Sequence, residues 1–152
     1  ALNKGHITPD ELTEIHQRLH RRRGVARLAP WWALVDGRAE SPVETWARLD
    51  CHDHGLPPDD LQIVLRDHQG EFIGRGDMGW RRADGGWVIA EIDGVEVHST
   101  PDALYQDRHR QNRLLTGAGA VVLRFTNADL RQPGTIARDV HRALHAQQPL
   151  RP

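Results

Sequence analysis

Residues 87–94, with the sequence Trp-Val-Ile-Ala-Glu-Ile-Asp-Gly, decide the fold of this chain. The first four are apolar, and such a run is typical of a central strand that is covered on both faces. Because side chains alternate along a strand, Glu91 and Asp93 are expected on one side, about 6–7 Å apart along the backbone. We therefore predict a buried strand with two carboxylates at its end.

A β-hairpin is predicted just before this strand. Apolar and polar residues alternate at 61–66, a polar turn follows at 67–70, and residues 72–80 form the returning arm. Asp77 lies in the returning arm. Because neighbouring strands are about 4.8 Å apart, we expect its carboxylate beside that of Glu91.

A crossover is predicted after the central strand. Thr100, Pro101 and Asp102 are typical of a helix start, and the apolar run at 120–125 is typical of a second buried strand. A strand, a helix and a strand in this order predict a right-handed connection with parallel pairing. A last helix carries an apolar stripe of Ile136, Val140 and Leu144.

Two further helix starts precede the hairpin. Thr8 with Glu11, and Ser41 with Glu44, have the spacing of a capping box, and a proline follows each N-cap. The buried side of the second helix is expected to hold Val43, Trp46, Ala47 and Leu49. The pattern predicts an α/β or α+β fold, with a mixed central sheet flanked by helices over residues 39–148. A small N-terminal helical segment at 1–38 precedes it.

The composition does not decide whether the protein binds nucleic acid. The 152 residues carry a net charge of -1, which alone argues against a nucleic-acid partner. Between Asp36 and Asp102, however, fifteen acidic residues stand against six arginines, and the flanks are rich in arginine. An acidic centre bordered by arginine is typical of a nuclease, which holds cations centrally and phosphates at its rim. An ordinary mixed surface is the alternative.

The sequence contains one cysteine, Cys51, and nothing that resembles a signal peptide or a membrane span. We therefore expect a cytoplasmic protein with no membrane partner. The chain opens with Ala1 rather than Met, so the natural chain could carry a DNA-binding domain upstream.

Carboxylates on neighbouring strands predict a metal site. Asp77, Glu91 and Asp93 would repel one another unless a cation neutralised them. Oxygen ligands of this kind suit Mg²⁺ or Mn²⁺ rather than zinc. The alternative is that Glu91 is exposed at an edge or paired with an arginine.

Six motifs follow one another along the chain. They are Ser-Pro-x-Glu at 41–44, Asp77 with Trp80, Glu-x-Asp-Gly at 91–94, His98, Asp-Arg-x-Arg-Gln-Asn-x-Leu at 107–114, and Leu-Arg-Phe-Thr at 123–126. Their order and spacing resemble the PD-(D/E)XK nucleases related to the very-short-patch repair (Vsr-like) endonucleases, over about residues 41–144. The resemblance implies a restriction-endonuclease-like fold and metal-dependent hydrolysis of DNA phosphodiester bonds.

The resemblance also implies roles for individual residues. It assigns catalysis to Asp77, Glu91, Asp93 and His98, and the metal to Asp77, Glu91 and Glu44. Asp93 is a departure, because many relatives have a lysine there, and an aspartate supplies no positive charge to the attacking water or the phosphate. A second metal, His98 or an arginine would then have to help. Glu44 could instead complete the capping box, and His98 could be a solvated loop side chain.

Three arginines are candidates for binding the DNA phosphates. Arg108 and Arg110 begin the predicted helix after the central strand, and the resemblance implies that such a basic residue points toward the active site, where it could clamp a phosphate. A solvated helix face is the alternative for both. Arg124 lies in an otherwise apolar strand, so we expect it to have a carboxylate or phosphate partner.

Two functions remain open at this point. The first is a Mg²⁺-dependent DNA endonuclease that uses Asp77 and Glu91. The second is a catalytically degenerate nuclease fold that serves as a DNA-binding or regulatory module, as in toxin–antitoxin systems. The absent lysine and the nearly neutral charge favour the second. The sequence does not indicate the DNA target or the oligomeric state.

Overall fold

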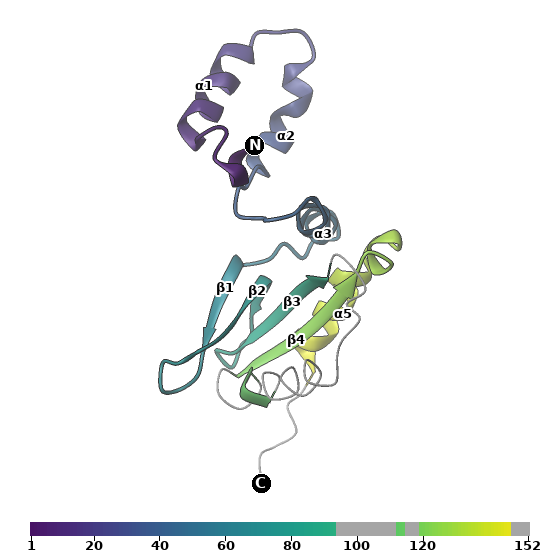
Figure 1. Ribbon diagram of the computed structural model, residues 1–152. Coiled ribbons are helices and arrows are strands. Elements are labelled where there is room, and N and C mark those ends of the chain that lie inside the picture. Colours follow the sequence, from purple (N-terminus) through teal and green to yellow (C-terminus); the bar gives the residue numbers. More distant parts are fainter. Residues whose placement is uncertain (94–111, 115–118, 147–152) are drawn as a thin grey trace. The chain divides into compact units, whose positions relative to one another are not determined.

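The computed structural model describes residues 1–93, 112–114 and 119–146 (Figure 1). The chain divides into two compact units, Ala1–Glu40 and Ser41–Pro152. The first unit contains η1 (Leu2–Lys4), α1 (Pro9–Leu19), η2 (Val25–Leu28) and α2 (Ala29–Ala33). The second contains α3 (Pro42–Asp53), β1 (Asp60–Arg66), β2 (Phe72–Arg81), β3 (Trp87–Asp93), β4 (Ala120–Thr126), η3 (Asp129–Arg131) and α5 (Thr135–His145).

The four strands form one mixed sheet in the order β1-β2-β3-β4. β1 and β2 pair antiparallel, as do β2 and β3, whereas β3 and β4 are parallel. The predicted α+β class, the hairpin and the parallel pairing are therefore confirmed. Parallel register places Glu91 beside Arg124 and Asp93 beside Thr126.

Apolar side chains cover both faces of the sheet. On one face, Val88, Ala90 and Ile92 pack in a cluster with residues of α3 and α5, among them Ala47 and Ile136. On the other, Ile89 packs with apolar side chains of the hairpin and of β4, and with Leu114. The alternation predicted for β3 is confirmed, because successive residues enter different clusters.

The pairing of β2 with β3 changes partway along both strands. The Cα partners run from Arg81 and Trp87 to Met78 and Ala90. Beyond Met78 and Ala90 the regular β2–β3 pairing ends, while β2 continues to pair with β1 and β3 with β4. Asp77 is the neighbour of Met78 and Glu91 the neighbour of Ala90, so both residues lie where the regular pairing of β2 with β3 ends.

The two helix starts expected before the hairpin are present, whereas the one expected at Thr100, Pro101 and Asp102 lies outside the described residues. In α1, the Glu11 amide donates to Thr8 Oγ1, and the Thr8 amide donates to the Glu11 carboxylate, which makes a capping box. In α3, Ser41 Oγ accepts a hydrogen bond from the Glu44 amide at 3.1 Å.

One prediction about α3 is wrong. Trp46 is 68% exposed, although the sequence placed it on the buried side. The buried residues of α3 are Glu44, Ala47 and Cys51, which follow one another at intervals of three and four. Position 46 is about 100° around the helix from position 47, so it falls outside this stripe.

In the first unit, neither α1 nor α2 contains a buried residue. Among the described residues, no helix combines the length and the apolar character needed to cross a bilayer.

Candidate active site

Asp77 is the centre of the candidate site. Its side chain is half-buried, and Oδ2 accepts a hydrogen bond from the Ile92 amide at 2.7 Å. The carboxylate thus serves as a hydrogen-bond partner for β3 where the regular pairing with β2 has ended. Burial is the main reason why the pKa of Asp77 is raised from 3.8 to about 6. The charges of Glu44 and Glu91 also raise this pKa, whereas the Ile92 amide and Arg75 lower it.

Glu44 brings a second carboxylate to the site from α3. It is 9% exposed, and the only other polar or charged residue in the buried class among the described residues is Thr135. Glu44 Oε2 accepts a hydrogen bond from Gln62 Nε2 at 3.0 Å. Burial of a carboxylate is costly unless hydrogen bonds or opposite charges compensate it, and this contact compensates part of that cost.

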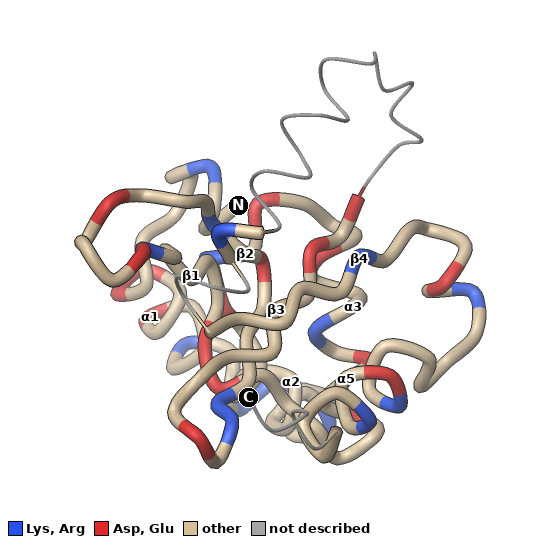
Figure 2. Tube along the Cα trace, turned by 90° about the horizontal axis from the view of Figure 1, so that it is seen from below, with Lys and Arg blue, Asp and Glu red and all other residues tan. Residues whose placement is uncertain are grey.

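Glu91 brings the third carboxylate and lies against Arg124. Arg124 Nε donates to Glu91 Oε2 at 3.2 Å, and the two side chains are 33% and 12% exposed. The parallel register of β3 and β4 makes these residues direct neighbours. Arg124 therefore has a carboxylate partner, one of the two kinds expected for it. Figure 2 shows the acidic end of β3 next to a basic segment of β4.

The remaining sequence-based candidates are Asp93, His98, Arg108 and Arg110. Asp93 is at the exposed end of β3, and it is not among the charges that shift the pKa of Asp77. His98, Arg108 and Arg110 fall outside the described residues. The structure thus brings together Asp77, Glu44, Glu91 and Arg124 as one electrostatic site.

The three carboxylates fit a hard cation by their chemistry, but their contacts are with the protein. The charges of Glu44 and Glu91 both raise the pKa of the half-buried Asp77 carboxylate, and carboxylate oxygens suit Mg²⁺. Among residues 1–93, 112–114 and 119–146, no three His, Cys, Asp or Glu side chains are close enough to form a ready metal site. A cation shared by these carboxylates would require Glu44 or Glu91 to turn from its present partner toward Asp77.

Gln62 is a residue of the site that the sequence did not indicate. Its side chain contacts Glu44, and its backbone has a φ of 54°. In the sequence it alternates with Leu61 and Ile63, which is the ordinary pattern of a solvent-facing strand residue. No local signal distinguishes it from other polar residues of the hairpin.

Sequence comparison finds two uncharacterized proteins, from two strains of Mycobacterium tuberculosis. Each is 33% identical to this chain over 123 residues, or 81% of the chain. The chain spans 44% of the length of these relatives. No family model and no solved structure matches the chain. The relatives supply no activity to compare, so the function must be argued from the site itself.

The raised pKa of Asp77 predicts a pH dependence of stability. The folded pKa is about 6 and the ordinary value is 3.8, so the folded state holds this proton more tightly than the unfolded state. The free energy of unfolding should therefore fall as the pH rises from about 4 to about 6, and stay lower above that range. An asparagine at position 77 cannot ionise and can still accept from the Ile92 amide. We expect Asp77→Asn to be about 2 kcal/mol more stable than the wild type at pH 7.

Urea unfolding of both proteins at pH 4, 5, 6 and 7, without divalent cations, measures this effect. The difference between the two proteins isolates the titration of Asp77 from that of other groups. A difference that stays constant over this range would show that Asp77 titrates normally.

Proposed function

We propose that this protein is a Mg²⁺-dependent endonuclease that hydrolyses phosphodiester bonds in DNA at the site formed by Asp77, Glu44 and Glu91. One observation carries the proposal: the half-buried carboxylate of Asp77 has a pKa raised to about 6, and two further carboxylates contribute to that shift. Perturbed carboxylates grouped at one point are characteristic of functional sites, where they are retained although they destabilise the fold. The order of helix, hairpin, central strand and parallel strand supports the resemblance to PD-(D/E)XK nucleases.

Each residue of the site would have its own role in the reaction. Asp77 and Glu91 would hold the cation, and Glu44 would add negative charge from α3. A bound Mg²⁺ would polarise the scissile phosphate and lower the pKa of a water molecule. Arg124 lies against Glu91 and, being partly exposed, could donate a hydrogen bond to a phosphate oxygen.

The chain departs from many PD-(D/E)XK relatives in having no lysine at the site. Position 93 is an aspartate, and the only lysine of the sequence is Lys4. Positive charge next to the phosphate would therefore come from an arginine, from His98 or from the cation. Arg124 contacts the Glu91 carboxylate directly, and the charge of Arg75 acts on Asp77.

The second candidate function is a nuclease fold that binds or regulates without hydrolysis. The observation that favours it is that the Glu91 carboxylate already accepts a hydrogen bond from Arg124, and the Glu44 carboxylate one from Gln62. In such a protein, the ion pair would replace the cation as the means of neutralising the site.

A plasmid-nicking assay separates the two functions. Purified protein is incubated with supercoiled DNA and Mg²⁺ or Mn²⁺, with EDTA as the metal-free control. A nuclease produces open circles only with the cation. Unchanged plasmid under all conditions, at protein concentrations where DNA is bound, would favour the module without hydrolysis.

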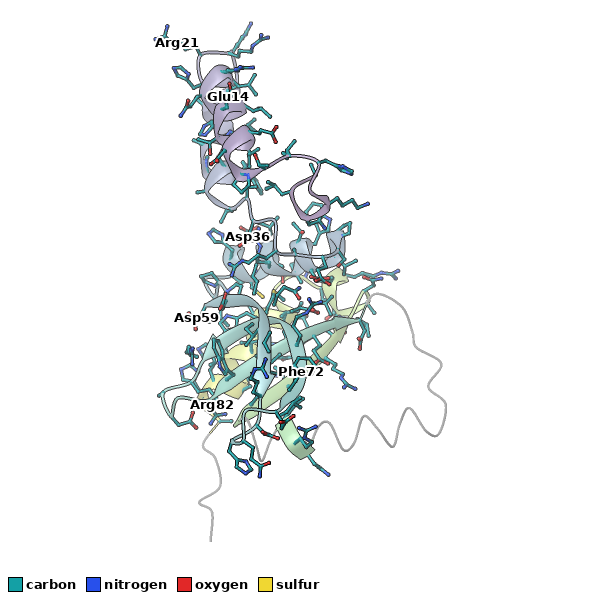
Figure 3. The ribbon with its side chains drawn as sticks, turned by 60° about the vertical axis from the view of Figure 1, so that its left-hand side comes forward. Glu14, Arg21, Asp36, Asp59, Phe72 and Arg82 are labelled. Atoms are coloured by element: carbon teal, nitrogen blue, oxygen red, sulfur yellow. The ribbon has the colours of Figure 1, made fainter. Side chains whose placement is uncertain are left out.

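The first unit offers a basic surface for the DNA backbone. Between Ile15 and Val35 there are five arginines and no acidic residue. All five are exposed, and four of them, Arg21, Arg22, Arg23 and Arg27, lie in the turn after α1 and in η2. Figure 3 shows Arg21 beyond the end of α1, at the opposite end of this unit from Asp36. Guanidinium groups suit phosphates because they donate two parallel hydrogen bonds.

We expect the triple change Arg21→Gln, Arg22→Gln and Arg23→Gln to weaken binding to a short DNA duplex about tenfold. The slope of log K against log salt should also fall by about three, because each lost phosphate contact removes about one unit. Fluorescence anisotropy in EDTA measures binding without cleavage. The control exchanges Arg131, Arg138 and Arg142, which are also exposed and whose loss lowers the charge by the same amount. Equal losses in both triples would mean that only net charge matters.

A further inference from the structure

The first unit has an exposed apolar face. Leu28 ends η2, Trp31 lies in α2, and Val35 follows α2, where its amide donates to the Trp32 carbonyl. Spacings of three and four residues place these side chains on one side of the helical turns. Leu28, Trp31 and Val35 are 47%, 54% and 45% exposed, and we call them the α2 face. Compact units of about 40 residues rarely bury enough apolar surface by themselves, so such a face is expected to pack against a partner.

A cavity adjoins the α2 face. It has a volume of about 570 Å³, and Val35 is one of the residues that line it. Leu2 and Leu12 supply apolar lining, and the ion pair of Asp36 with Arg38 also borders the cavity. Because Val35 belongs to both the face and the cavity, an apolar side chain that lies against Val35 can enter the cavity.

The first unit carries opposite charges at its two ends. Four exposed arginines lie in the turn after α1 and in η2, at the end next to Leu28: Arg21, Arg22, Arg23 and Arg27. The end next to Val35 carries four acidic residues and two basic ones: Asp10, Glu11, Asp36, Glu40, Lys4 and Arg38. Figure 3 shows Arg21 and Asp36 at opposite ends of this unit. The α2 face thus runs from a basic end to an acidic end.

These features fit a second copy of the chain in the antiparallel orientation. A two-fold axis near Trp31 would set Leu28 of each copy against Val35 of the other, because these residues lie three and four positions from Trp31. Leu28 would then reach the cavity next to Val35 of the other copy. The basic end of each copy would lie beside the acidic end of the other, and such complementarity favours association. A parallel pair would instead bring the arginines of both copies together.

We propose that the α2 face is the interface of a two-fold dimer of this chain. The same patch serves both copies in such an interface, which closes the assembly at the dimer. Trp31 lies at the centre, where a tryptophan commonly contributes much of the binding energy. Three half-exposed side chains and one cavity make a small interface, so the dissociation constant is expected on the order of tens of micromolar.

Sedimentation equilibrium of the purified chain, from about 1 μM to about 1 mM, tests the dimer over the range of weak association. The wild type should change from monomer to dimer over this range. Trp31→Asp should weaken the dimer about thirtyfold, the usual effect of losing a central tryptophan. Trp31→Ala, a milder exchange, should act in the same direction and serves if circular dichroism shows that Trp31→Asp is unfolded. Trp46→Asp is the matched control, at a 68% exposed tryptophan of α3, and should dimerise like the wild type.

The salt dependence distinguishes the antiparallel from the parallel arrangement. Salt shortens the Debye length from about 10 Å at about 0.1 M to about 3 Å at about 1 M, so it weakens attraction between opposite ends and relieves repulsion between like ends. We expect the dissociation constant to rise several-fold with salt. A wild type that is monomeric at about 1 mM, or a dimer that neither exchange of Trp31 weakens, would overturn the interface. A dimer that salt strengthens would overturn the antiparallel arrangement.

Discussion

Asp77→Asn should abolish the metal-dependent nicking of plasmid DNA while the protein remains folded. The exchange removes the charge that would hold the cation, and it keeps the size of the side chain and an acceptor for the Ile92 amide. We expect the nicking rate to fall about a thousandfold, which corresponds to about 4 kcal/mol in the activation barrier. The same variant should be more stable than the wild type at pH 7, because the carboxylate of Asp77 is destabilised by burial and by its acidic neighbours. Gain of stability with loss of activity is characteristic of a functional residue.

The control for this variant is Asp53→Asn, at the exposed end of α3. The Asp53 side chain is 64% exposed, and the exchange makes the same change in net charge. Nicking should continue at the wild-type rate. If Asp77→Asn nicked DNA as fast as Asp53→Asn, catalysis by this site would be excluded.

Gly76→Ala should be the most destabilising single methyl addition near the site. A Cβ on Gly76 would lie 2.2 Å from Cγ2 of Ile89, a distance at which something must shift. Ile89 is fully buried, so its methyl group has little space into which to move. We expect a loss of about 2–3 kcal/mol in the free energy of unfolding, which is the upper range for overpacking a core.

The steric cause can be checked with a second exchange. Ile89→Ala removes the methyl group that a Cβ at position 76 would meet, although it costs about 2–5 kcal/mol by itself. In the double variant, Gly76→Ala should be better tolerated by about 1–2 kcal/mol than in the wild-type background. Urea unfolding of the four proteins gives this coupling. Additive losses would mean that Gly76 matters for another reason, such as its backbone conformation.

Much of the fold could be predicted because its signals are local. The capping residues Thr8 and Ser41 mark their helices through contacts within one turn. The apolar run at 87–90 indicated a central strand, and a second apolar run after a predicted helix indicated parallel pairing. Both depend on periodicity and chain length, which a sequence displays directly.

The candidate site was only partly predictable. The grouping of Asp77 with Glu91 followed from strand neighbours, but the partner of Arg124 depended on the register of β4, which the sequence left open. Gln62 was missed because a left-handed φ is normally associated with glycine or asparagine, and tertiary contacts impose it here. Trp46 was misplaced because its large apolar side chain outweighed its helical phase in the prediction.

We propose that the carboxylates of Asp77, Glu44 and Glu91 together bind a hard divalent cation. A Mn²⁺ titration of the wild type and of Asp77→Asn by isothermal titration calorimetry, at pH 7, tests it most directly. We predict saturable binding to the wild type that Mg²⁺ displaces, and no detectable binding to Asp77→Asn. Equal binding to both proteins, or heat no larger than that of dilution with the wild type, would contradict the claim.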